Sequence, residues 1–243
     1  MKLAVMDSVL AVDDVVAEAI RLGVAGLELT VTRAELRSAY DRPLDRVRRD
    51  AAVASLEIHA LVLGDHNHGG VASADPHTSE AAAEDVHRAI GLAAELGADV
   101  ILIPFFLEAQ LRTDGDFDRC ADAFAALCPA AAERGVSLCF EGLLPADRIQ
   151  ALAALVASPA FGCYFDLANP LRRGLDPPTE IRSLGSLVRR VHVKDMLLRP
   201  GDVRPGRGRV DFMECALALA EVGYDGWLTL ETPPALPLSP RAI

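Results

Sequence analysis

Short apolar, β-branched runs recur along this chain, and several end on a side chain that can bind a metal. The run Val188–Val193 contains His192, and three similar runs end on acids, at Glu141, Asp166 and Glu231. The intervals between these positions are close to the roughly 30-residue length of one strand-plus-helix unit in an eight-unit barrel. Buried parallel strands are nearly continuous apolar runs, and their carboxyl ends meet at one face of the sheet. The pattern therefore predicts an α/β fold that gathers acids and one histidine at its strand ends.

Eight apolar runs can form strands, and the segments between them have the apolar repeat and the capping residues of helices. The predicted strands are residues 3–6, 24–29, 55–63, 99–104, 136–141, 162–166, 188–193 and 226–231. The predicted helices are residues 13–22, 41–54, 79–96, 116–134, 145–157, 177–184 and 211–222. In the helix over 79–96, Ser79 is the expected N-cap and Gly97 the expected stop.

The alternation of strands and helices predicts one domain over residues 1–243. Because βα crossovers in a parallel sheet are right-handed, a TIM (β/α)8 barrel is favoured. The alternative, a doubly wound open sheet, would place ligand ends at one switch point and would not collect four successive strands as naturally. Residues 232–243 contain four prolines, so the final helix is expected to be short or missing. The barrel surface left uncovered there favours a homo-oligomer.

Composition and apolar patterning disfavour several classes of partner. A net charge of −11 opposes a nucleic-acid partner, because such proteins usually present a basic surface. The five cysteines are odd in number and contain no Cys-x-x-Cys pair, which favours reduced thiols. Asp7 interrupts any signal-peptide core, and no apolar run approaches the roughly 18 residues of a membrane span. The protein is therefore predicted to be cytoplasmic, without a membrane partner.

Four potential ligands at the ends of apolar strands indicate a metal site. A single acid at a strand end is usually solvated, and His192 alone could be a hydrogen-bonded core residue. An unpaired buried carboxylate, however, is destabilising by several kcal/mol, and a bound cation removes that penalty. Carboxylate oxygens with one imidazole suit a divalent ion such as magnesium, manganese or zinc. Asp195 is close enough in sequence to orient the imidazole of His192 or a substrate.

Several segments carry a resemblance to a known family. They are His192-Val-Lys-Asp195, Tyr164-Phe-Asp166-Leu-Ala-Asn169, the strand-terminal Glu141, the loop Pro205–Phe212 and Glu231. On these segments the chain resembles the xylose isomerase-like TIM-barrel superfamily. Within it, the chain is similar to the sugar phosphate isomerase/epimerase group, which includes hydroxypyruvate isomerase, inosose dehydratase and ketose 3-epimerases.

The resemblance implies that Glu141, Asp166, His192 and Glu231 hold one divalent cation, commonly manganese, magnesium, cobalt or zinc. It also implies that Glu141 and Glu231 act as an acid–base pair on opposite sides of the substrate. The chemistry agrees, because a metal chelated by a carbonyl and its adjacent hydroxyl stabilises an enediolate while a carboxylate moves the proton. Many relatives have histidine in place of Asn169, which can bind a hydroxyl but cannot take up a proton at neutral pH.

The loop after His192 contains candidate substrate contacts. Arg204, Arg207 and Arg209 lie there, and an arginine can pair bidentately with a phosphate or carboxylate. The alternative is a solvated turn. Lys194 is a further candidate, although it is expected to point away from His192 if the strand continues.

Two earlier strands and one loop supply the remaining candidates. Glu28 and His59 end or line the second and third strands, and either could reach substrate hydroxyls. His66 and His68 lie in a glycine-rich loop, where they could cover the site as a lid. The alternative for these two histidines is an exposed surface position.

Together with the ligand pattern, the resemblance implies a divalent-metal-dependent isomerase or epimerase of a small sugar, sugar phosphate or hydroxy-carbonyl compound, working through a metal-stabilised enediolate. A dehydratase of the inosose or dehydroshikimate type is the nearest enzymatic alternative. A non-catalytic metal-binding barrel is a third possibility, opposed by the presence of Glu141 and Glu231. The DNA-repair endonuclease branch of the same fold is disfavoured, because it requires more histidines for its three-zinc cluster.

Overall fold

The computed structural model describes residues 1–10, 12–38 and 43–232. Contacts between backbone positions divide the chain into two compact units. The first unit comprises Met1–Leu29, Pro43–His59 and Tyr164–Ile243, and the second comprises Thr30–Arg42 and Ala60–Cys163. A single domain over residues 1–243 therefore stays a prediction, and each unit is described separately below.

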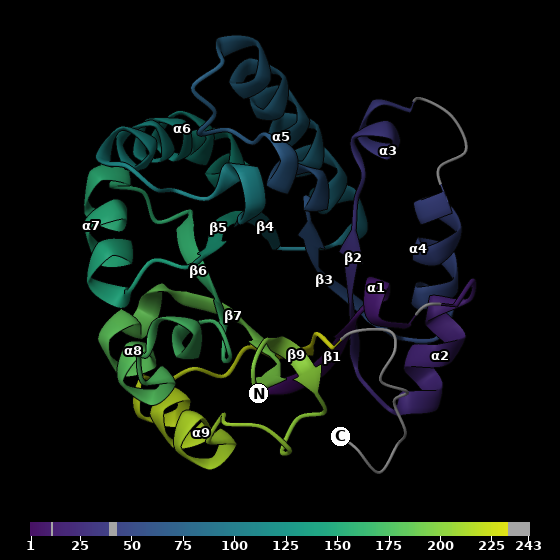
Figure 1. Ribbon diagram of the computed structural model, residues 1–243. Coiled ribbons are helices and arrows are strands. Elements are labelled where there is room, and N and C mark those ends of the chain that lie inside the picture. Colours follow the sequence, from purple (N-terminus) through teal and green to yellow (C-terminus); the bar gives the residue numbers. More distant parts are fainter. Residues whose placement is uncertain (11, 39–42, 233–243) are drawn as a thin grey trace. The chain divides into compact units, whose positions relative to one another are not determined.

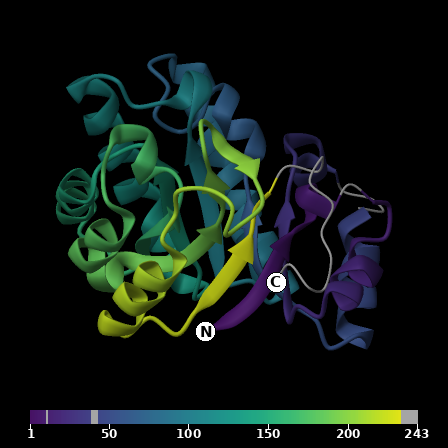
Figure 2. The same ribbon diagram turned by 60° about the horizontal axis from the view of Figure 1, so that its bottom comes forward.

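The first unit contains a parallel sheet in which β1 (Lys2–Met6) lies between β2 (Gly26–Thr30) and β10 (Trp227–Leu230). On its other edge β10 pairs with β7 (Val188–Val193), with Leu230 opposite Val193. Figure 2 shows β1 and β10 side by side, although they come from opposite ends of the described chain. This pairing brings Glu231 and the β7 residues together across more than 30 positions of sequence.

Helices alternate with these strands in the first unit. They are α1 (Asp7–Leu10), α2 (Val15–Leu22), α4 (Pro43–Val53), α8 (Pro177–Leu184) and α9 (Phe212–Glu221), with short 3-10 turns at Pro170–Arg173 and Gly185–Leu187. Helices α8 and α9 pack against each other (Figure 1). After β7 the chain forms a small antiparallel hairpin from β8 (Asp195–Met196) and β9 (Pro200–Val203).

The second unit has its own parallel run, in which β4 (Val100–Phe105) pairs with β3 (Glu57–Val62) and β5 (Ser137–Gly142), and β5 pairs with β6 (Phe161–Asp166). Its helices are α3 (Arg33–Arg37), α5 (Pro76–Leu96), α6 (Asp114–Glu133) and α7 (Ala146–Val156), with 3-10 turns at Gly64–His68 and Leu107–Ala109. Phe105 stacks on Phe140, and Phe124 meets Phe161 edge-on. These aromatic pairs form much of its buried core.

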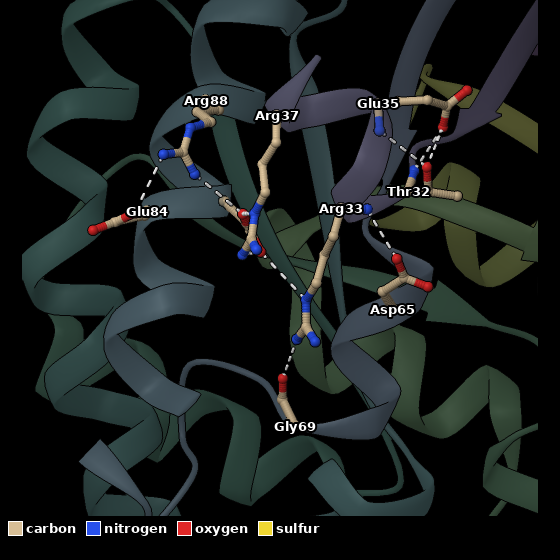
Figure 3. A network of polar contacts seen from close by, with 9 residues as sticks. Thr32, Arg33, Glu35, Arg37, Asp65, Gly69, Glu84 and Arg88 are labelled. Carbon is tan, nitrogen blue, oxygen red and sulfur yellow. Dashed lines mark hydrogen bonds and ion pairs between the residues drawn. The ribbon is translucent and has the colours of Figure 1, made fainter. Parts of the chain in front are cut away.

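A buried acid joins α3 to α5 in the second unit. Asp85 is fully buried, and its carboxylate makes ion pairs with Arg33 at 3.3 Å, Arg37 at 3.0 Å and Arg88 at 3.3 Å. Figure 3 shows the three guanidinium groups converging on one point between the two helices. Arg88 also pairs with Glu84. The cluster satisfies a buried charge entirely with groups of the chain itself.

All eight predicted strands are present, with ends that shift by one or two residues. The helix predicted to begin at Ser79 begins instead at Pro76, because Asp75 caps it by accepting a hydrogen bond from Thr78 N. Similarly, α6 begins two residues before the predicted Asp116, because Thr113 and Asp116 form a capping box. The sequence reading missed α1, α3 and the β8–β9 hairpin, which are too short to show a periodic pattern.

One glycine allows close packing inside the first unit. A Cβ at Gly26 of β2 would collide with the indole ring of Trp227, so only glycine fits there. Trp227 in turn stacks on His59, with ring centroids 4.6 Å apart. Tight packing at this point therefore holds His59 in one orientation.

Two sequence predictions concern the ends and the surface of the fold. The short or missing final helix was expected over residues 232–243, of which 233–243 lie outside the described residues. In the part of the chain that the structure describes, every helix is too short or too polar to cross a lipid bilayer. All five cysteines are buried and free of disulfides, as predicted.

Candidate functional site

Three of the four predicted ligands come together in the first unit. Asp166 ends β6, His192 lies in β7 and Glu231 follows β10. Each offers a ligand atom within 4.8 Å of those of the others. The fourth predicted ligand, Glu141, is a buried residue near the end of β5 in the second unit. Its participation stays a prediction.

The two oxygens of Asp166 have different surroundings. Oδ1 accepts hydrogen bonds from the backbone N–H groups of Ala168 at 2.6 Å and Asn169 at 3.0 Å. Oδ2 lies 3.1 Å from Lys194 Nζ. The backbone of the following turn therefore fixes the carboxylate, and one oxygen stays directed at the basic group.

Glu231 meets two basic groups. Its Oε2 lies 2.6 Å from Lys194 Nζ and 3.0 Å from His192 Nδ1. Burial alone would raise the pKa of Glu231, but its ion pairs with His192 and Lys194 outweigh burial and lower the pKa to about 2. The carboxylate is therefore ionised at neutral pH, which is the state that binds a cation.

The position of Lys194 corrects a sequence prediction. The side chain was expected to point away from His192, because alternate residues of a strand face opposite sides. However, β7 ends at Val193, so the alternation no longer applies to Lys194. Its ammonium group lies between Asp166 and Glu231.

Glu28 also differs from its predicted role as a contact to substrate hydroxyls. It is fully buried. Its Oε1 lies 2.7 Å from His192 Nε2, and its Oε2 accepts a hydrogen bond from the hydroxyl of Tyr164. Glu28 therefore contacts the imidazole on the side opposite Glu231. The sequence reading had placed an orienting carboxylate at Asp195 instead.

Asp195 holds the loop that follows the β8–β9 hairpin. Its two oxygens accept hydrogen bonds from four backbone N–H groups, those of Met196, Arg207, Gly208 and Val210, at 2.7 to 3.1 Å. A Cβ at Gly208 would collide with this carboxylate. The predicted contact of Asp195 with the imidazole or a substrate is thus replaced by a backbone-binding role.

His59 is also displaced from its predicted role. It lies in the first half of β3, buried against Trp227. Its Nδ1 accepts a hydrogen bond from Arg190 Nε at 3.3 Å, and its Nε2 lies 3.2 Å from Thr229 Oγ1. Both ring nitrogens are used within the core, so a direct contact of His59 with substrate is not supported.

Three candidates for substrate contact remain, two at the surface and one buried. Arg204 and Arg207 are exposed in the loop that Asp195 holds. Asn169 is buried next to Asp166, which its backbone N–H contacts. The roles of these three side chains in binding substrate stay predictions.

The two histidines of the glycine-rich loop occupy opposite environments. His68 is exposed and contacts Glu108 at 2.9 Å. His66 is buried, and neither ring nitrogen has a hydrogen-bond partner among the described residues. Burial lowers the pKa of His66 to about 4, with a further contribution from the charge of Arg33. A surface position is therefore wrong for His66.

The donor set suits a divalent cation. Asp166 Oδ2 and Glu231 Oε2 are buried oxygens whose ion-pair contacts lack hydrogen-bond geometry within the described residues. They converge with His192 in a group that has more acidic than permanently basic side chains. Carboxylate oxygens and one imidazole nitrogen match the preferences of magnesium, manganese and zinc. These residues could therefore hold such an ion.

Comparisons with known proteins identify the family and the fold of the chain. Residues 16–243 match the family model described as xylose isomerase-like TIM barrel. The solved structure of an L-ribulose 3-epimerase superposes with a TM-score of 0.80 at 20% identity, covering 96% of this chain and 81% of that chain. The predicted fold class, a TIM barrel with eight parallel strands, is confirmed.

Curated relatives match over part of their length. A 2-epi-5-epi-valiolone 7-phosphate 2-epimerase of Actinoplanes sp. is 36% identical over 106 residues, which is 42% of this chain and 38% of that protein. An inosose dehydratase of Lacticaseibacillus casei is 24% identical over 142 residues, which is 49% of this chain and 48% of that protein. The chain thus spans less than half the length of either relative.

Proposed function

Because the chain belongs to the xylose isomerase-like TIM barrel family, we propose that it is a divalent-metal-dependent isomerase or epimerase. Its substrate would be a small sugar, sugar phosphate or hydroxy-carbonyl compound. The observation that carries this proposal is the convergence of Asp166, His192 and Glu231 within 4.8 Å. The epimerases among its relatives support it.

Glu141, Asp166, His192 and Glu231 would hold one manganese, magnesium, cobalt or zinc ion. When bound, that ion supplies a positive charge that makes a proton next to the substrate carbonyl easier to remove. Glu141 and Glu231 would move that proton, one on each side of the substrate. The low pKa of Glu231 makes it a weak base while Lys194 is in contact. Lys194 would therefore have to leave Glu231 before this carboxylate takes up a proton.

The loop after β9 would bind an anionic group of the substrate. The side chains of Arg204 and Arg207 are exposed, and neither has an ion pair with a described residue. Arginine can bind phosphate or carboxylate through two parallel hydrogen bonds. Asn169 would contact a hydroxyl, and Lys194 would contact substrate once released from Glu231.

Metal analysis after dialysis tests the proposal, with His192→Ala as the comparison. The wild type should retain about one equivalent of a divalent metal, since one ligand set is proposed, and the variant should lose it. Ketoses and hydroxypyruvate would then be screened for deuterium incorporation from solvent. A wild type that takes up none of the four metals, even when they are added, would contradict the proposal.

A dehydratase is the second candidate, favoured by the similarity to inosose dehydratase. Both reactions begin with removal of a proton next to a carbonyl, so the residues discussed above would serve either. The products differ, because a dehydratase releases water and an epimerase returns an isomer of the same mass. Mass spectrometry of the product therefore separates them.

We also propose a cytoplasmic homo-oligomer. An apolar hollow of about 240 Å³ beside α9 is lined by apolar residues that include Leu3, Phe212 and Leu219. Leu3, Met213 and Leu217 are exposed hydrophobic residues of the same elements. A second copy that covered them would remove apolar surface from water, and light scattering would measure the resulting mass.

A further inference from the structure

We propose that Glu28 is a positioning residue, and that a buried hydrogen-bond chain ending on it determines which nitrogen of His192 faces the metal. The inference rests on the metal site of the proposed function. It concerns a role that the sequence reading assigned to none of these residues. This hydrogen-bond chain lies entirely within the first unit, and the inference does not depend on the identity of the substrate.

The chain links six buried side chains from five strands. Arg190 Nε lies 3.3 Å from His59 Nδ1, His59 Nε2 lies 3.2 Å from Thr229 Oγ1, and Thr229 Oγ1 lies 3.1 Å from the hydroxyl of Tyr164. The Tyr164 hydroxyl donates to Glu28 Oε2, and Glu28 Oε1 lies 2.7 Å from His192 Nε2. Each of these residues is at most 8% exposed.

The direction of the first bonds follows from Arg190. A guanidinium group only donates hydrogen bonds, so Nδ1 of His59 must accept. In neutral imidazole the other nitrogen then carries the proton, and Nε2 of His59 donates to Thr229. Burial and the positive charge of Arg190 lower the pKa of His59 well below its usual value, which is consistent with the neutral ring. Thr229 can then donate its own proton to Tyr164.

Glu28, at the other end of the hydrogen-bond chain, requires the same direction of hydrogen-bond donation. A carboxylate only accepts hydrogen bonds, so Glu28 accepts one from Tyr164 and one from His192. Tyr164 can donate to Glu28 because it accepts from Thr229. With an obligatory donor at one end and an obligatory acceptor at the other, one arrangement of protons satisfies every member of the chain.

This arrangement of protons determines the protonation of the two ring nitrogens of His192. Its Nε2 keeps the proton that Glu28 accepts, so Nδ1, the nitrogen that faces Glu231, is the one that gives up its proton and offers a lone pair when a metal binds. The Tyr164 ring also packs on the imidazole, with centroids 4.2 Å apart. Carboxylates that accept from the far nitrogen of a metal-binding histidine fix its tautomer and orientation. Glu28 is in the right place for this role.

Metal binding by variants of Glu28 tests the inference. Tyr164 and His192 contact different oxygens of Glu28, and in glutamine one of these positions is an NH2 donor, so one of the two hydrogen bonds is lost. Glu28→Gln should weaken Mn²⁺ binding about 10- to 100-fold, measured by calorimetric titration. Unchanged affinity would overturn the inference.

A matched pair of tyrosine variants separates positioning from general destabilisation. Tyr164→Phe removes the donor to Glu28 but keeps the ring, and it should weaken Mn²⁺ binding by less than Glu28→Gln. Tyr224→Phe removes a hydroxyl that donates to Trp227 O at 2.7 Å and is not part of the buried hydrogen-bond chain. It should leave Mn²⁺ affinity unchanged. Equal losses in both variants would indicate a structural effect and contradict the inference.

Nitrogen NMR of histidine-labelled protein gives a reading that does not depend on metal. His192→Gln identifies the His192 signals, and the spectrum of the metal-free wild type should show a proton on Nε2, whether or not Nδ1 also carries one toward Glu231. In Glu28→Gln the fraction of rings with a proton on Nε2 should fall. A wild-type ring with its proton on Nδ1 and none on Nε2 would overturn the inference. If the wild type bound no metal, the proposed function would fail while the tautomer result would still decide the inference.

Discussion

Acids with buried carboxylate oxygens occur in both units, but their charges are balanced in different ways. In the second unit, Asp85 has ion pairs with three arginines (Figure 3). In the first unit, Asp166 and Glu231 share one lysine, Lys194. The Asp85 cluster has more permanent cations than anions, whereas the other group has more anions than permanent cations.

The difference separates a structural cluster from a candidate site. Arginine remains charged at any ordinary pH, so Asp85 is neutralised without a ligand. The charge of a histidine depends on its protonation, and one ammonium group cannot neutralise two carboxylates. The second arrangement has an excess negative charge that a cation can neutralise. A buried acid therefore indicates a functional site when the basic side chains around it do not balance its negative charge.

The largest expected effect is on turnover. Glu231→Gln keeps the shape of the side chain but removes its charge and its ability to move a proton. We expect kcat to fall by about 10²- to 10⁴-fold, the usual contribution of a proton-transferring side chain. The variant should remain folded and unfold cooperatively, as calorimetry would show. Turnover that survived this change would remove Glu231 from the mechanism and weaken the contrast with Asp85.

The next effect is on stability. Asp85→Asn should lower the free energy of unfolding by about 3 kcal/mol, because the buried partner of the arginines loses its charge. Urea denaturation measures this. Arg182→Gln is the control, since Arg182 and Glu221 form an exposed pair and such pairs contribute little. If Asp85→Asn were as stable as the wild type but lost metal or turnover, the structural reading of Asp85 would be wrong.

The smallest effect concerns a buried group with no compensating partner. The pKa of His66 is lowered to about 4 in the folded protein, whereas an unfolded histidine titrates near 6.5. Between these values the unfolded state binds more protons, so stability falls as the pH falls. His66 should account for a loss of about 2 kcal/mol between about pH 7.5 and 5.

His66→Asn isolates that contribution, because the other titrating groups are common to both proteins. The difference in unfolding free energy between the two pH values should be larger for the wild type than for the variant. Equal differences would mean that His66 has the same pKa folded and unfolded. In that case, burial without a hydrogen-bond partner would be insufficient to shift the pKa of His66.

The strands were predictable because most are apolar runs, and some, such as β4 and β6, are buried along their whole length. The first residues of the helices were harder to predict. Asp75 and Thr113 cap α5 and α6, whereas the apolar pattern alone favoured later starts. Short elements such as α3 escaped detection because five residues contain little more than one helical turn. The sequence therefore determined the order of strands and helices, with small errors at their ends.

The sequence by itself also determined that Asp166, His192 and Glu231 stand at strand ends, because residue type and apolar spacing are local properties. Only the tertiary structure decided their partners. It placed Glu28 on the far side of His192, turned Lys194 between two carboxylates, and bound Asp195 to a loop. The physical reason is that a hydrogen bond depends on positions in space, and Glu28 and His192 are brought together by strands far apart in sequence.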